Sequence, residues 1–152
     1  MDLGTLIHNY LKQAKLMQVA TSKGNQPWAC TVYFSFDDEL NLYWISTPDR
    51  RHSEEIRNNE KVAGTIVLPH TPGDKVRGVQ FQGVAEELND KDEAKEAMKN
   101  YAERYSMNNE RVNEILENRD GDGHLPYKIS PTLYVLFDEL NFPEDPRHEY
   151  KL

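Results

Sequence analysis

The spacing of apolar residues predicts that the chain opens with one helix and then continues as strands. Near the start, apolar side chains recur every three or four residues, the spacing of a helix face: Leu3, Leu6, Ile7, Tyr10, Leu11 and Ala14. From residue 16 the period becomes two, which is typical of half-buried strands. Alternating runs between Gly, Pro and Asp turn residues predict strands at 16–22, 28–36, 42–45, 61–68, 76–88 and 127–138.

The strand at 28–36 has the clearest alternation of all. One face carries its apolar residues, Trp28, Cys30, Val32, Phe34 and Phe36. The opposite face carries Ala29, Thr31, Tyr33 and Ser35.

A second helical stripe interrupts the strands after residue 88. It runs through Ala94, Ala97, Met98, Tyr101, Ala102 and Tyr105. A shorter helix is expected around Val112, Ile115 and Leu116, so a helical insertion covers about residues 90–119. We therefore expect a single domain, 1–152, of the α+β class, mainly β with inserted helices. Its antiparallel strands are expected to close into a small barrel, because closure removes exposed edges. The polar tail at 143–152 is expected to be loosely held.

Composition and charge exclude several classes of partner. The chain has 18 Lys and Arg against 26 Asp and Glu, a net charge of −8, and most of the excess lies between residues 86 and 122. We interpret that acidic run as a solvated helix face. An acidic field repels phosphate backbones and anionic lipids, so we predict neither nucleic-acid nor membrane binding. The lack of a secretion signal and the single cysteine, Cys30, indicate a cytoplasmic location.

The segment at 46–52 is the strongest candidate for a binding site. A strand ends there and a short helix is expected to follow, with Thr47 as its cap and Pro48 in its first position. Basic side chains then crowd the first helical turn, where the helix dipole disfavours cations: Arg50, Arg51 and His52. Free backbone N–H groups, the Ser46 and Thr47 hydroxyls and two guanidiniums would together bind a phosphate. The alternative is that Glu54 and Glu55 pair with the arginines, a contribution of only about 0.3–0.5 kcal/mol.

A second candidate lies on the strand that follows residue 76. Gln80 and Gln82 share one face, and Gly78 and Gly83 allow a bulge or the close approach of a backbone or flat ligand. The two amides either pair with the edge of a heterocycle or form a solvent-facing row, and the sequence leaves both interpretations open.

Other patterns indicate little chemistry. Asn118, Asp120 and Asp122 copy the first half of a calcium loop without its closing Glu, which favours a turn. The five histidines lack zinc-ligand spacing, so we expect no metal site. Cys30 lies on an apolar strand face and is interpreted as a small buried hydrophobe rather than a nucleophile.

Several motifs, taken in order, form a pattern that is met in one known superfamily. They are Val19-Ala20-Thr21-Ser22, Thr31-Val32-Tyr33-Phe34, Leu42-Tyr43-Trp44-Ile45-Ser46-Thr47, Arg51-His52 and Gly78-Val79-Gln80-Phe81-Gln82-Gly83. This pattern resembles the flavin-binding split-barrel superfamily, whose best-known member is pyridoxamine 5′-phosphate oxidase. The likeness is strongest to small bacterial members with an Arg-His pair and a Gly-Val-Gln-Phe strand.

The resemblance implies a six-stranded antiparallel split barrel and a homodimer, with flavin mononucleotide (FMN) in a groove at the subunit interface. It implies a phosphate held by a hydroxyl residue and a basic pair, and an isoalloxazine ring lying along the second strand. The candidate cofactor-binding residues are Cys30, Thr31, Val32, Tyr33, Ser46, Thr47, Arg51, His52 and Gln80.

The departures from the oxidase limit what can be expected. Cys30 and Ser35 stand where the oxidase has a phosphate-binding Arg and a shared Lys, and Gln80 only approximates its Gln, whose matching position is Gly78. No counterparts of its substrate-clamping residues are evident, which argues against vitamin B6 oxidation, and no general acid or base can be named.

We therefore expect an FMN-dependent oxidoreductase whose substrate the sequence does not identify. The main alternative is a non-enzymatic binding module that holds flavin, haem or another planar ligand, and a deazaflavin cofactor is also compatible. A flavin-free interaction protein on the same barrel is the third possibility.

Overall fold

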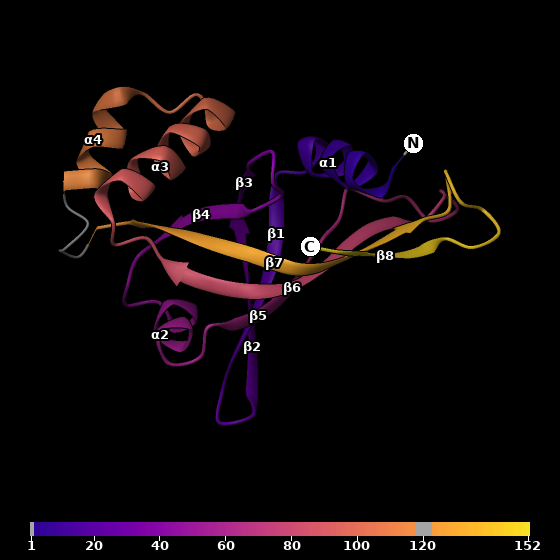
Figure 1. Cartoon of the computed structure of the whole chain (residues 1–152), viewed down its shortest axis with the longest axis horizontal. Coiled ribbons are helices and arrows are strands. Elements are labelled where there is room, and N and C mark those ends of the chain that lie inside the picture. The colour runs from indigo at the N-terminus through magenta and orange to yellow at the C-terminus, as the bar shows by residue number, and fades with distance from the viewer. Residues whose placement is uncertain (1, 118–122) are drawn as a thin grey trace.

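One antiparallel sheet of eight strands forms the body of the molecule. The computed structural model describes residues 2–117 and 123–152. The strands are β1 (Leu16–Lys23), β2 (Gln26–Tyr33), β3 (Ser35–Phe36), β4 (Leu42–Ser46), β5 (Lys61–Ile66), β6 (Arg77–Glu87), β7 (Leu125–Asp138) and β8 (Arg147–Lys151). Their order is β2-β1-β5-β6-β7-β4-β3, with β8 also paired to β7 (Figure 1). The chain is therefore mainly β, as predicted.

The sheet closes at one end and stays open at the other, which makes the barrel a split one. β2 pairs with β1 along all eight of its residues, whereas β3 pairs with β4 at Ser35 and Phe36. The chain changes partner at Phe34, whose N–H donates to the Lys15 carbonyl at 3.2 Å. Beyond that point β2 and β4 are not hydrogen-bonded to each other, so their edges border an opening.

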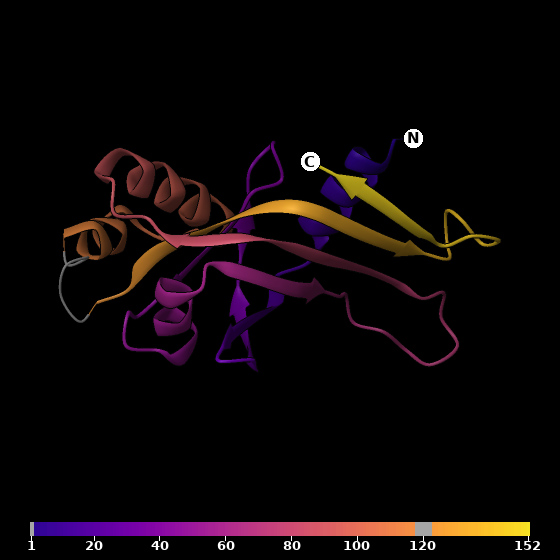
Figure 2. The same cartoon turned by 60° about the horizontal axis from the view of Figure 1, so that its bottom comes forward.

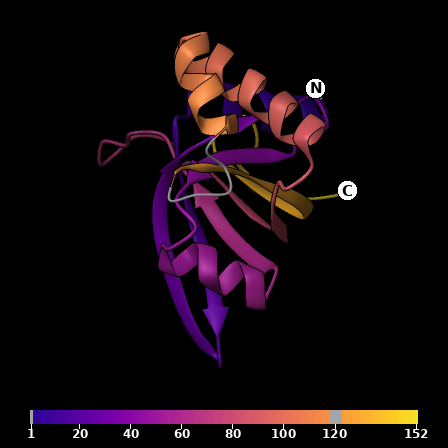
Figure 3. The ribbon, with the colours of Figure 1, turned by 90° about the vertical axis from the view of Figure 1, so that its left-hand side faces the viewer.

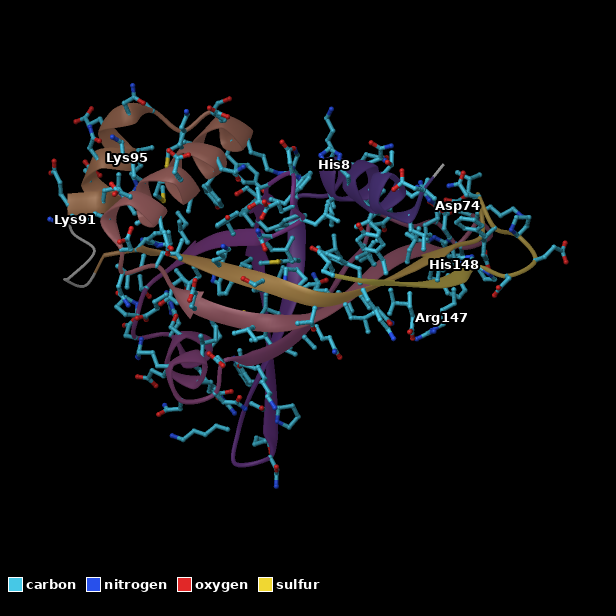
Figure 4. All side chains as sticks on the ribbon, viewed as in Figure 1. His8, Asp74, Lys91, Lys95, Arg147 and His148 are labelled. Carbon is cyan, nitrogen blue, oxygen red and sulfur yellow. The ribbon has the colours of Figure 1, made fainter. Side chains whose placement is uncertain are left out.

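In the described part of the chain, four helices are packed around the sheet. They are α1 (Leu3–Gln13), α2 (Arg51–Asn58), α3 (Lys91–Tyr105) and α4 (Asn109–Glu117). The α3–α4 pair and α2 lie on opposite sides of the strands (Figures 1 and 3). The long β6 and β7 strands extend beyond the barrel, away from α3 and α4 (Figure 2). Figure 4 shows Lys91 and Lys95 at the α3 end of the molecule, and Arg147 and His148 toward the opposite end.

The core lies inside the barrel and is covered at one end by α1. Leu6, Ile7, Tyr10 and Leu11 of α1 are buried, as the helical spacing predicted. The Tyr10 hydroxyl donates to the Arg77 carbonyl at 3.2 Å and accepts from the Leu68 N–H at 2.9 Å. These two bonds tie the helix to the start of β6 and to the segment that follows β5.

Two expectations about the strands were wrong. The alternation at 28–36 predicted one strand, but the ladder breaks at Phe34, because alternation fixes the faces of a strand and not its partner. The tail at 143–152 was expected to be loosely held, yet it contains β8, with its tyrosine packed against the core (Tyr150). The described residues therefore form a sheet of eight strands where six were expected, with β8 paired only to β7, and the predicted split-barrel class is confirmed.

The length and hydropathy of the helices bear on whether the chain crosses a membrane. In the residues that the structure describes, no helix is both long enough and apolar enough to cross a membrane. The turn expected at 118–122 lies outside the described residues.

Candidate functional site

The end of β4 and the start of α2 bring a hydroxyl and an imidazole into contact. Ser46 is the last residue of β4 and His52 is the second residue of α2. The Ser46 Oγ and His52 Nε2 atoms are 2.8 Å apart, and both residues are more than 90% buried, with exposures of 8% and 7%. The sequence placed both residues in one phosphate site, and the structure brings them together.

The surroundings of His52 favour its neutral form. Burial lowers the pKa of His52 below the usual value of 6.5, and the positive charge of Arg50 lowers it further, while Glu55 acts in the opposite direction. The imidazole is therefore uncharged near neutral pH. A dianion at this position would reverse the balance, because an adjacent negative charge stabilises imidazolium.

The turn at 47–50 differs from the expectation for the helix start. α2 begins at Arg51, so the helix starts later than predicted, with Arg50 at the N-cap. Thr47 was expected to be the cap, but its hydroxyl donates to Asp49 Oδ1 at 2.6 Å, which closes a local turn first. Within the described residues no side chain caps α2, so its first N–H groups remain open to a ligand.

A network of hydrogen bonds holds the turn at 47–50 in place. Ser53 Oγ donates to the Thr47 carbonyl at 2.8 Å, and Arg57 Nη2 donates to the Pro48 carbonyl at 2.9 Å. Arg57 Nη1 also donates to Glu87 Oε1 on β6 at 2.6 Å. The turn is therefore fixed both to its own helix and to the sheet.

Arg51 lies on the other side of the helix start, against β1 and β2. Its guanidinium carbon is 4.1 Å from the centre of the Trp28 ring, and its Nε donates to Glu55 Oε2 at 2.8 Å. The carboxylate pairing that competed with an anion site is thus present for Arg51. Because His52 contacts β4 while Arg51 contacts β2, the start of α2 spans the two strands that border the opening.

The candidate residues of β2 point in two directions. Cys30 and Val32 are half-buried and pack against the barrel core. Burial raises the pKa of the Cys30 thiol, which agrees with a hydrophobic and unreactive role. Thr31 and Tyr33 are exposed on the opposite face, and the Tyr33 ring meets Tyr105 edge-on at 5.6 Å. The strand therefore does not present all four residues to one ligand face.

Gln80 lies on the outside of the barrel, away from the Ser46–His52 pair. The registers place it in one cross-strand row with Thr65, Gln18 and Thr31. At the usual strand spacing, Gln80 is about 14 Å from Thr31 across that row. A pocket of about 410 Å³ lies beside it, lined mainly by small and uncharged residues of β1, β5, β6 and β7. One chain therefore does not bring Gln80 next to Thr31, the candidate residue on β2 in the same row.

The sequence did not indicate that Arg50 and His124 would lie near each other. Burial lowers the pKa of both His52 and His124, Arg111 lowers that of His124 further, and the charge of Arg50 acts in the same direction on both rings. His124 is distant in sequence and precedes β7, so no local pattern could have connected it to α2. Among residues 2–117 and 123–152 no three His, Cys, Asp or Glu side chains are grouped to hold a metal ion.

Comparison with known proteins is consistent with this architecture. A UPF0306 protein from Pasteurella multocida is 36% identical over 81 residues, which are 53% of this chain and 54% of that protein. The chain thus spans about half the length of the curated relatives it matches. A candidate pyridoxamine 5′-phosphate oxidase from Listeria innocua has a TM-score of 0.68 at 22% identity, covering 89% of this chain and 98% of that one. HutZ, a haem storage protein from Vibrio cholerae, has a TM-score of 0.68 at 18% identity, covering 86% and 91%.

The structural likenesses lie below 25% identity and show the fold alone. The family assignment comes from the sequence: residues 5–124 match the family described as pyridoxamine 5′-phosphate oxidase. That match covers most of the chain, including the strands and α2 around the Ser46–His52 pair. The chain belongs to the pyridoxamine 5′-phosphate oxidase family.

Proposed function

We propose that the chain binds FMN and uses it in an oxidoreductase reaction, with the phosphate at the start of α2. The observation that carries this proposal is the buried Ser46–His52 contact beside an uncapped helix N-terminus. A hydroxyl, an imidazole and open N–H groups are donors for phosphate oxygens, and the helix dipole favours negative charge there. Arg51 would add a guanidinium from the β2 side. The donors present therefore fit a phosphate monoester.

The ring would lie along β2, next to the phosphate. Along 26–32 the edge of β2 that faces away from β1 is not part of a described ladder, so its N–H and C=O groups are open for pairing. A flavin ring has donors and acceptors on one edge that suit such a strand. When bound, the flavin supplies hydride or electron transfer, while the chain binds it, orients it and excludes water.

The first test compares FMN with riboflavin, which lacks the phosphate. We expect the purified chain to bind FMN more tightly than riboflavin, and Arg51→Ala to weaken FMN binding about tenfold while leaving riboflavin binding unchanged. Fluorescence titration of each flavin measures both affinities. Equal affinity for the two flavins would contradict the phosphate site, and no binding of either flavin would contradict the proposed function.

We also propose that two copies pair through the outer face of the sheet, with the cofactor between them. On β1, β2, β5, β6 and β7 this outer face carries two adjacent rows of uncharged residues, which end at Glu149 and Lys151 on β8: Gln18, Ala20, Ala29, Thr31, Ala63, Thr65, Gln80, Gln82, Leu133 and Val135. In a chain with 29% charged residues, a patch without charge is typical of an interface core. Pairing would also let one copy supply Gln80 to a site begun by the other copy.

A charge placed on the outer face tests the dimer. Ala63→Lys puts an ammonium group in the middle of this exposed face, so we expect the dimer to dissociate at micromolar concentration and FMN binding to weaken with it. Sedimentation velocity measures the mass, and Ala29→Ser, at the edge of the face, is the control. Unchanged mass in Ala63→Lys would contradict this interface.

The haem alternative has one observation in its favour, the fold likeness to HutZ, a haem storage protein. The absorption spectrum of the purified chain separates the two, because haem and flavin absorb at different wavelengths. Turnover with a reduced nicotinamide cofactor separates an oxidoreductase from a binding module. The deazaflavin cofactor and the cytoplasmic location stay predictions.

A further inference from the structure

Glu55 is a buried carboxylate whose two oxygens are both engaged. It lies one helical turn after Arg51 on α2 and is only 3% exposed. Thr21 Oγ1 on β1 donates to its Oε1 atom at 2.9 Å, and Arg51 Nε donates to its Oε2 atom at 2.8 Å. The hydrogen bond from Arg51 lowers the pKa of Glu55, so the carboxyl is ionised at neutral pH. The carboxylate is therefore fixed between the sheet and the arginine.

The same contacts restrict Arg51 to one orientation. Trp28 covers one face of the guanidinium at 4.1 Å, and Glu55 takes the Nε edge at 2.8 Å. No described residue accepts a hydrogen bond from Arg51 Nη1 or Nη2, and the side chain is 46% exposed. The two terminal nitrogens, which form the planar fork that binds phosphate in two places, are thus presented to solvent.

A carboxylate beside an anion site has two opposing effects. Its negative charge repels a phosphate and partly neutralises Arg51. Its hydrogen bond also restricts the rotation of the Arg51 side chain before any ligand is bound. Arg51 therefore loses less conformational entropy when it binds a phosphate. Glu55 itself is buried and held by Thr21, whereas Arg51 is half-exposed, so the hydrogen bond fixes the Nε edge of Arg51 and leaves its terminal nitrogens in solvent.

We propose that Glu55 is a positioning residue, which orients Arg51 through Nε so that its terminal nitrogens bind the phosphate group of the cofactor. The proposal rests on the proposed FMN function, and it assigns to Glu55 the orientation of Arg51 before the phosphate binds. Thr21 serves the same purpose one step further away, by fixing the other oxygen of Glu55. Together with Trp28, the three side chains join β1, β2 and α2 at one edge of the opening.

The test is the ratio of FMN affinity to riboflavin affinity in the full chain. Glu55→Gln keeps the shape of the side chain and can still accept from Thr21, but it loses the charge that holds Arg51. We expect this ratio to fall about fivefold, because FMN binding weakens while riboflavin binding stays unchanged. Glu54→Gln is the matched control, since it removes the same charge from the exposed neighbouring position on α2.

An increase in the ratio of FMN affinity to riboflavin affinity in Glu55→Gln would overturn the proposal. If Glu55 only neutralised Arg51, Glu55→Gln would raise the affinity for FMN and the ratio would increase. An unchanged ratio would show that Glu55 only supports the fold. A wild-type chain that binds neither flavin would refute the proposed function, whereas a wild-type preference for FMN that Glu55→Gln leaves unchanged in size would refute the positioning role alone.

Two further variants guard against a loss of folding. Thr21→Val removes only the hydrogen bond to Glu55 Oε1, and we expect a smaller fall in the same ratio. In an Arg51→Ala background, Glu55→Gln is expected to leave the ratio unchanged, because the side chain that it orients is gone. A fall of equal size in that background would contradict the proposal. Fluorescence of Trp28, which is 42% exposed, reports whether Arg51 has left its ring.

Discussion

Replacing Gly83 with alanine is expected to destabilise the fold by about 3 kcal/mol, a large share of a typical domain's stability. Gly83 lies at the register shift between β6 and β7 and is buried. A Cβ atom there would overlap the carbonyl of Ser130 and lie 2.7 Å from the Cα atom of Pro131. Both neighbours are backbone atoms of a central strand, so no side-chain rotation can relieve the overlap. The strands would have to separate at the bulge.

Gly78→Ala on the same strand is the matched control. A Cβ atom at Gly78 would meet only the Val67 side chain, at 3.5 Å, which is ordinary contact. We expect its free energy of unfolding to stay within about 1 kcal/mol of wild type. Urea denaturation at fixed protein concentration, followed by the fluorescence of buried Trp44, measures both variants. Equal unfolding midpoints for the two variants would contradict the steric argument.

These two glycines illustrate what the sequence could and could not predict. The strand prediction assigned a bulge or close approach to both, but only Gly83 has it. Local patterns define which residues face the core, and they did so for α1 and for Cys30 and Val32 of β2, whereas Trp28 on the same predicted face is 42% exposed. The close approach of β6 to β7 depends on the partner strand, which lies more than 40 residues later in the chain. The same limit explains the missed break at Phe34 and the missed strand β8.

The candidate site shows the same division between local and distant information. Ser46 and His52 are six residues apart, so a strand end followed by a helix start was enough to pair them. The contacts of Arg51 and Glu55 could not be found completely, because Trp28, which covers Arg51, and Thr21, which donates to Glu55, come from strands much earlier in the chain. The sequence predicted the pairing of Glu55 with Arg51 as a surface ion pair. In the structure Glu55 is buried, so its carboxylate holds Arg51 in a fixed orientation.

Removing the Ser46–His52 pair is expected to weaken FMN binding about a hundredfold. The double variant Ser46→Ala, His52→Ala deletes the pair, which offers one free donor to the phosphate because its two atoms already share a hydrogen bond. A hydrogen bond to a charged group contributes up to about 3 kcal/mol, which corresponds to about a hundredfold in affinity. Fluorescence titration with FMN measures the loss, and riboflavin binding is expected to be unchanged. An equal loss for both flavins would show that the variant damages the fold instead of the phosphate site.

The pH dependence of FMN binding provides the sharpest test of His52. In the protein without ligand, burial and Arg50 hold the pKa of His52 below 6.5, so the ring is neutral at pH 7. A bound phosphate favours imidazolium and raises this pKa, so binding takes up a proton and the affinity increases as the pH falls from 8. Each unit by which the pKa rises allows up to a tenfold gain in affinity. The gain stops near pH 6, because the phosphate monoester itself is protonated with a pKa of about 6.

His52→Gln keeps a hydrogen-bonding group that does not titrate, so this variant should lose the gain in FMN affinity between pH 8 and 6. A variant profile that matches wild type would exclude His52 from the phosphate site, since the remaining dependence would belong to FMN alone.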